Sequence, residues 1–102
     1  MDETSRQFIQ SPLYQGVDET IAYTLTTTPW GSTPSSVSVV AKEADGTDVS
    51  GDVLSGSASV ASDVITTPTV QSLTAGKVYR LEIKFTTAGN VLEAWGLIRA
   101  RT

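Results

Sequence analysis

The sequence predicts an all-β fold in which two layers of antiparallel strands pack as a sandwich. Several segments alternate apolar and polar residues, which is the pattern of strands buried on one face. Thr and Val, whose β-branched side chains favour strands, are abundant, and no segment carries apolar residues at helical spacing over three turns. The 102 residues suit one domain. We therefore expect about seven strands and almost no helix.

A turn that ends at Gly76 is followed by Tyr79, the first large inward side chain of the next strand. In immunoglobulin-like sandwiches, a Tyr at the start of the penultimate strand folds over the corner and bonds the upstream backbone. This position predicts an immunoglobulin-like antiparallel β-sandwich over residues 18–102.

The first 17 residues are expected to form an extended N-terminal arm or an edge strand. Phe8 and Ile9 form a short apolar segment there, and Pro12 ends it because proline has no amide donor. The first regular strand is predicted at residues 19–26. Its expected inward side chains are those of Ile21, Tyr23 and Leu25.

Shorter elements are expected in the middle of the chain. Residues 28–34 hold two prolines and a glycine around Trp30 and should form a loop. A strand at 36–43 should end in a turn at Asp45-Gly46, where glycine supplies a positive φ. Further strands are expected near residues 49–54, 57–61 and 64–70, the last on an edge because it contains Pro68.

The last hairpin joins strands predicted at residues 77–86 and 91–99. A loop with an even number of residues gives the hairpin one wholly apolar face, whereas an odd loop would turn Glu93 and Arg99 inward. We therefore predict an even loop. The expected inward residues are Tyr79, Leu81, Ile83, Phe85, Leu92, Ala94, Gly96, Ile98 and Ala100.

Two even registers remain open. With Gly89-Asn90 as the turn, Arg80 would face Arg99, and the two charges would repel. With Thr87 paired to Asn90, Lys84 would face Glu93 and attract it.

Both registers place Trp95 and Leu97 on the outer face. Leaving an indole in water forgoes several kcal/mol of burial energy. Either residues 1–17 or a partner protein should therefore cover Trp95. Trp30 is expected to plug one end of the sandwich.

Charge is unevenly distributed along the chain. Residues 1–63 hold nine acidic and two basic residues, whereas residues 77–101 hold five basic and two acidic ones. The ordinary interpretation is a solvated charged face. The alternative is an electric polarity that helps ordered packing against neighbours. With a net charge of −4, the chain is not expected to bind nucleic acid.

The residue inventory argues against an enzyme. The chain has no Cys and no His, so it lacks thiolate chemistry and the commonest general base and metal ligand. Asp45, Asp48 and Asp52 form its one dense acidic cluster, but their spacing does not match the helix–loop–helix calcium pattern. No phosphate-binding glycine loop, signal peptide or membrane-spanning run is seen. We predict no catalytic residues, no cofactor, no metal and no membrane partner.

Residues 73–83, followed by 85–93 and 98–100, resemble a group of small immunoglobulin-like structural proteins of tailed bacteriophages and prophages. Tyr23 and Trp30 resemble that group too. The resemblance implies a virion structural protein that is assembled in the bacterial host cytoplasm. Such a protein decorates or cements the capsid, or belongs to the head–tail junction or the tail.

The resemblance implies major capsid or tail proteins as partners, with the chain itself as a homo-oligomer or in many copies on the particle. The alternative function is a carbohydrate- or cell-surface-binding module of a phage fibre, in which Trp or Tyr rings stack on sugars. The candidate partner contacts are Phe8, Tyr14, Trp30, Trp95 and Leu97.

Overall fold

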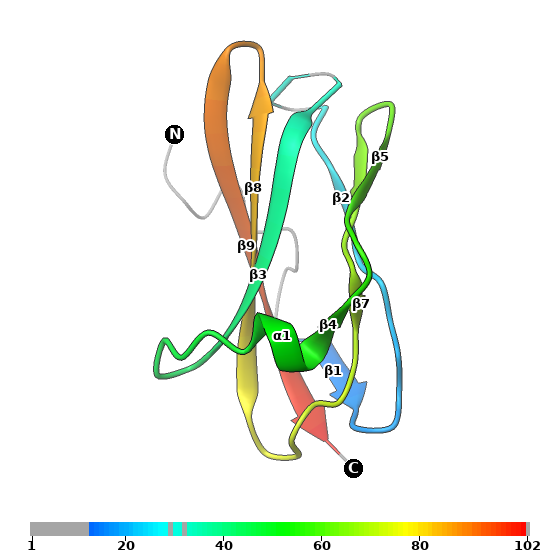
Figure 1. The fold of residues 1–102 in the computed structure, drawn as a ribbon, viewed down its shortest axis with the longest axis vertical. Coiled ribbons are helices and arrows are strands. Elements are labelled where there is room, and N and C mark those ends of the chain that lie inside the picture. The colour runs from blue at the N-terminus through cyan, green and yellow to red at the C-terminus, as the bar shows by residue number, and fades with distance from the viewer. Residues whose placement is uncertain (1–12, 29, 32, 102) are drawn as a thin grey trace.

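The computed structural model describes residues 13–28, 30–31 and 33–101. Within these residues the chain forms nine strand segments and one helical turn (Figure 1). In chain order they are β1 (Leu13–Gly16), β2 (Thr24–Thr26), β3 (Ser35–Glu43), α1 (Ser50–Val53), β4 (Leu54–Ser55), β5 (Ser59–Ala61), β6 (Val64–Thr66), β7 (Thr69–Val70), β8 (Val78–Thr87) and β9 (Asn90–Arg101).

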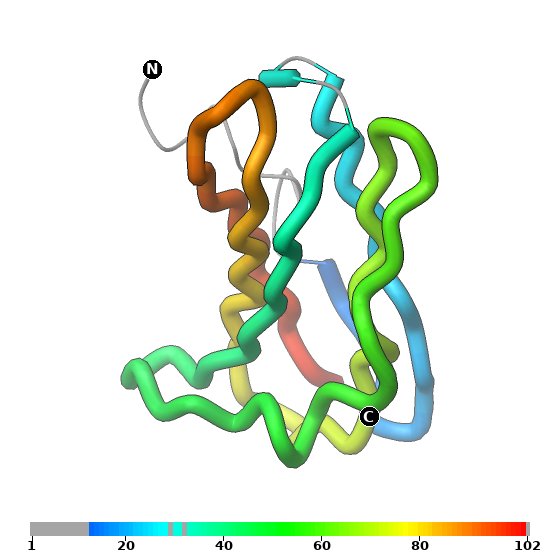
Figure 2. Tube along the Cα trace, turned by 45° about the horizontal axis from the view of Figure 1, so that its top comes forward, coloured from blue at the N-terminus to red at the C-terminus, as the bar shows by residue number. Residues whose placement is uncertain are grey.

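The strands build two layers that face each other, as Figures 1 and 2 show. One layer is a four-stranded sheet in the order β1-β9-β8-β3, in which β1 runs parallel to β9 and the other pairs are antiparallel. The other layer has the order β2-β6-β5, and β4 pairs with β7. A bridge between Ile21 and Val70 extends the pairing of this layer beyond β2. The nine segments therefore occupy seven strand positions, and the predicted all-β sandwich is confirmed.

Apolar side chains from both layers meet in two buried clusters. One cluster lies at the end of the sandwich that carries α1, and the other lies toward the β8–β9 turn. The first contains Ala41, Val53, Val70, Leu73, Tyr79, Leu81, Ile98 and Ala100. The second contains Leu25, Ile65, Ile83, Phe85 and Ala94.

The β8–β9 hairpin has the predicted even loop and takes the second of the two registers. Thr87 pairs with Asn90, so that Lys84 faces Glu93. The two loop residues, Ala88 and Gly89, have φ values of 51° and 79°, which suit the tight turn that matches strand twist. Every predicted inward residue of β8 is buried, and on β9 only Leu92 remains partly exposed.

Tyr79 makes the corner contact that its position predicts. The side chain is buried, and its hydroxyl oxygen accepts a hydrogen bond of 2.8 Å from the backbone N–H of Thr74. The contact ties the loop before β8 to the strand that follows it.

The N-terminal part of the chain joins the sandwich as an edge strand from Leu13 onward. This strand begins directly after Pro12, and the apolar segment Phe8-Ile9 lies outside the described residues. The strand predicted at 19–26 keeps its alternation, with Leu25 buried, but only Thr24–Thr26 pair regularly.

One predicted strand is wrong. Residues 49–54 form the helical turn α1 and only the start of β4. The Asp48 carboxylate accepts the backbone N–H of Ser50, and the Ser50 hydroxyl accepts the N–H of Ala41. These side-chain hydrogen bonds turn the backbone where a ladder was expected.

The predicted strand at 64–70 is interrupted, and its expected edge position is wrong. β6 and β7 lie between neighbours on both sides, and the break falls at Thr67 and Pro68. Pro68 cannot donate to a ladder, but the Thr67 hydroxyl accepts the N–H of Tyr23 at 3.0 Å and donates to the carbonyl of Pro68 at 2.9 Å. The Thr67 hydroxyl thus gives the N–H of Tyr23 an acceptor at the break, and the strand can occupy the middle of its layer.

A buried amide links the two layers. Gln15 of β1 is 0 % exposed, and its Nε2 donates to the carbonyl oxygens of Val70 (2.7 Å) and Glu19 (3.0 Å). Its Oε1 accepts the Tyr23 hydroxyl at 2.7 Å. The edge strand is therefore held to the opposite layer by a fully engaged polar group.

We predict that Gln15→Ala lowers the free energy of unfolding by about 2–3 kcal/mol, because the Tyr23 hydroxyl and the carbonyls of Glu19 and Val70 each lose a side-chain partner. Gln15→Glu keeps the size but brings a carboxylate beside two carbonyl oxygens. It should destabilise the protein strongly at neutral pH and less at acidic pH, where the carboxyl can donate. Urea unfolding at two pH values measures both effects. Equal stability of Gln15→Ala and wild type would contradict the role of the amide.

Burial raises the pKa of the Tyr23 phenol above its ordinary value of 10.0, and the nearby Glu19 carboxylate adds to the increase. The stabilisation that this shift provides is complete below pH 10.0 and is lost as the pH rises through the folded-state pKa. We predict that Tyr23→Phe is less stable than wild type at pH 7 but loses less stability in alkali. Denaturant titrations across the alkaline range test this difference, and parallel curves would contradict it.

Candidate protein-binding face

The outer face of the four-stranded sheet gathers most of the positive charge of the chain. Lys42, Arg80, Lys84, Arg99 and Arg101 take the outward positions of β3, β8 and β9, and they are five of the seven basic residues. With Glu82 and Glu93 the face carries a formal charge of +3, whereas the whole chain carries −4. We call this surface, together with Tyr14, Trp95 and Leu97, the basic face.

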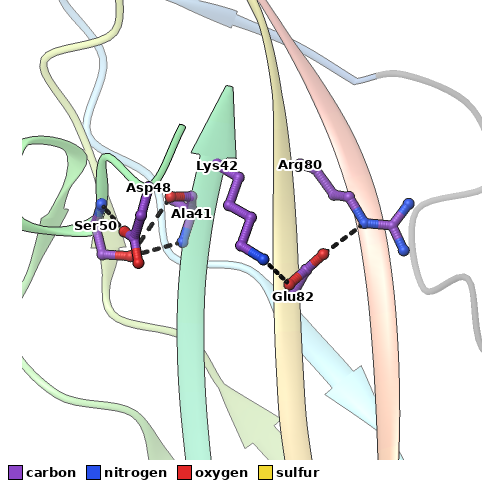
Figure 3. A network of polar contacts seen from close by, with 6 residues as sticks. All are labelled: Ala41, Lys42, Asp48, Ser50, Arg80 and Glu82. Atoms are coloured by element: carbon purple, nitrogen blue, oxygen red, sulfur yellow. Dashed lines mark hydrogen bonds and ion pairs between the residues drawn. The ribbon is translucent and has the colours of Figure 1, made fainter. Parts of the chain in front are cut away.

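Arg80 lies at the centre of the basic face in a fixed position. Its guanidinium lies 4.5 Å from the centre of the Trp95 ring system, and its Nε donates to Glu82 at 2.8 Å. Lys42 of β3 approaches the other oxygen of Glu82 at 3.4 Å. Figure 3 shows this row across the sheet, with the terminal nitrogens of Arg80 pointing away from Glu82. A cation stacked on an indole and held by a carboxylate is preorganised for contact with a further anion.

A second stack of the same kind lies at the β1 edge. The guanidinium of Arg101 is 4.1 Å from the centre of the Tyr14 ring, which is 53 % exposed. β1 pairs with the end of β9, where Tyr14 faces Arg99. The parallel pairing thus brings the N-terminal aromatic ring beside two C-terminal arginines.

A shallow depression lies between these charges and the hairpin that follows β3. Val78 and Leu97 provide its apolar surface, and Lys42, Arg80 and Glu82 provide its charged surface. Glu43, Ala44 and Gly46 border it. The combination of apolar and charged lining can receive a partner side chain that has an apolar stem and a negative end.

The structure brings three of the five candidate contact residues onto one face, namely Tyr14, Trp95 and Leu97. Phe8 lies outside the described residues. Trp30 lies elsewhere, partly buried against the second apolar cluster, with its ring 6.1 Å from that of Phe85. The predicted plug at one end of the sandwich is confirmed for Trp30.

The acidic cluster of the sequence does not converge. Asp45 accepts the backbone N–H of Thr47, Asp48 accepts that of Ser50, and these hydrogen bonds lower the pKa of both carboxyls. In the part of the chain that the structure describes, no group of three Asp or Glu residues is placed to hold a metal ion. Within that same part, no helix has the length and apolar character needed to cross a bilayer.

Comparison with known proteins gives no relative. No family model, no curated protein and no solved structure matches the chain.

Sequence reasoning found the aromatic residues of the face but not their partners. Arg80 and Trp95 come from neighbouring strands and lie close only in the observed register, in which Arg80 pairs with Leu97 and Glu82 with Trp95. The stack of Arg101 on Tyr14 needs the parallel β1–β9 pairing. In the sequence, the concentration of basic residues in residues 77–101 was the sign that pointed to both stacks.

We predict that Arg80→Ala shifts the fluorescence emission of Trp95 to longer wavelength, because the indole loses the guanidinium that covers it. The measurement uses a Trp30→Phe background, so that Trp95 is the only indole in the chain. Lys84→Ala, which removes a base from the same strand, serves as the control. Identical spectra for the two variants would contradict the stack.

Proposed function

We propose that this chain is a non-enzymatic structural protein of a tailed-bacteriophage particle, which binds an acidic surface of a neighbouring virion protein through the basic face. The observation that carries the proposal is the pair of arginine–aromatic stacks on one outward sheet face. Trp, Tyr and Arg are the residues that most often dominate protein–protein binding energy. Their positions here are set by regular strands, so little conformational entropy is lost on binding.

The immunoglobulin-like assignment is part of this proposal. The Tyr79 corner hydrogen bond supports it. The sequence resemblance to small phage structural proteins supplies the class of particle. Capsid decoration or cementing, the head–tail junction and the tail are the locations that this class offers.

The details of the face favour a protein partner over a glycan or a nucleic acid. A guanidinium covers one side of the Trp95 ring and one side of the Tyr14 ring, where a sugar would stack. Glu82 and Glu93 interrupt the bases, and they would repel a phosphate backbone. Mixed charges with a positive excess suit a protein surface with an acidic excess.

We predict that the chain co-sediments with phage particles produced by the host that carries its gene, and that raising the salt concentration weakens this association. Arg101→Glu should lower the affinity about tenfold or more, because it reverses the charge of one of the two stacked arginines of the basic face. Binding of fluorescently labelled protein to purified particles measures the effect.

The matched control is Thr24→Asp combined with Thr26→Asp, which lowers the net charge by the same two units on the opposite sheet. The control should bind as wild type does. Failure of wild type to associate with particles, or equal loss in both variants, would refute the proposal. Binding to host polysaccharide instead would establish the fibre-module alternative.

A further inference from the structure

We infer that two copies of this chain pair through β5, so that their three-stranded layers join edge to edge around a two-fold axis at Val60. This interface lies on a different layer from the basic face and is independent of the function proposed above. The sheet order β2-β6-β5 leaves β5 at an edge. Figures 1 and 2 both show the β5–β6 hairpin at the margin of the molecule.

The hairpin register determines which backbone groups point outward. Ser59 pairs with Thr66 and Ala61 with Val64, with a two-residue loop between the strands. In such a hairpin the pair that flanks the loop exchanges hydrogen bonds, and alternate pairs do the same. Ala61 and Ser59 thus direct their N–H and C=O toward β6. The N–H and C=O of Val60 point away from β6, toward the open edge.

The surrounding sequence makes this edge compatible with its own copy. A two-fold axis at Val60 pairs the same short segment of both copies, so charged residues of one sign in that segment would lie close together and repel each other. The ten residues from 53 to 62 carry no charge and contain no proline. Charged residues and Pro are among the devices by which natural edges prevent such pairing, and this segment has neither.

An apolar side chain adds a second, independent observation. Val60 pairs with Ile65, which is fully buried, yet Val60 itself is 40 % exposed. Antiparallel pairing about Val60 sets the two Val60 residues opposite each other. The pairing forms two reciprocal hydrogen bonds and covers apolar surface that is exposed in the monomer.

On the outer edge of β3, the backbone N–H and C=O of Ala41 already have hydrogen-bond partners. The N–H of Val49 donates to the carbonyl of Ala41 at 2.9 Å, and the Ser50 hydroxyl accepts the N–H of Ala41 at 2.9 Å. The register of β3 also shifts between Ser35 and Ser38. At Ala41 the outward backbone groups of β3 therefore have partners, whereas the N–H and C=O of Val60 in β5 face the open edge.

The test is the molar mass of the full chain over a concentration series, measured by light scattering and sedimentation equilibrium. Wild type should shift from one to two copies as its concentration rises. Val60→Pro removes an outward N–H that pairs with no strand in the described part of the chain, and Val60→Lys sets two like charges face to face. Both variants should remain monomeric with thermal unfolding close to that of wild type.

Val91→Lys is the matched control, because it makes the same substitution at a valine that is 61 % exposed on the four-stranded sheet. It should still form dimers, and so should Arg101→Glu. Wild type that stays monomeric at its highest soluble concentration would overturn the inference. Dimers of Val60→Lys as stable as those of wild type, or loss of dimers in Val91→Lys, would overturn it equally.

Discussion

The two-residue turn between β8 and β9 is the constraint on which the rest of the molecule depends. Side chains alternate along a strand, so the length of this turn decides which of them face the core. With Ala88 and Gly89 as the turn, one face of the hairpin is apolar and supports both buried clusters. The same turn sends Arg80, Trp95 and Arg99 outward. The core and the basic face are therefore two consequences of one register.

Much of the β8–β9 hairpin and of its role in the core could be predicted from the sequence alone. The parity of the hairpin followed because only one choice kept Glu93 and Arg99 out of the core. Tyr79 could be placed because a Tyr at the start of the penultimate strand of a sandwich typically folds over the corner and bonds the upstream backbone. Choosing between the two even registers was beyond the sequence, since the opposing charge pairs differ by only a few tenths of a kcal/mol. The structure takes the register in which Lys84 faces Glu93.

The two wrong strand predictions and the missed burial of Gln15 share a physical cause. In each case a polar side chain takes the place of a backbone hydrogen-bond partner. At Ser50 and Asp48, local hydrogen bonds form a helical turn in a segment whose composition suits a strand. At Thr67, a hydroxyl satisfies the backbone beside Pro68, and the strand stays inside its layer. Gln15 is the strongest case, because a glutamine near the N-terminus gives no sign that it will be fully buried. Its partners Val70, Glu19 and Tyr23 come together only in the folded chain.

The two proposed interfaces divide the sandwich between its layers. The basic face lies on the four-stranded sheet, and the β5 edge belongs to the three-stranded layer, so binding at one leaves the other free. Their physical character differs as well. The first depends on charge and weakens with salt, whereas the second depends on backbone pairing and on an uncharged strand that salt hardly affects. A dimer formed through β5 would present two basic faces, and binding both to one repetitive particle surface would raise the effective affinity without a new contact.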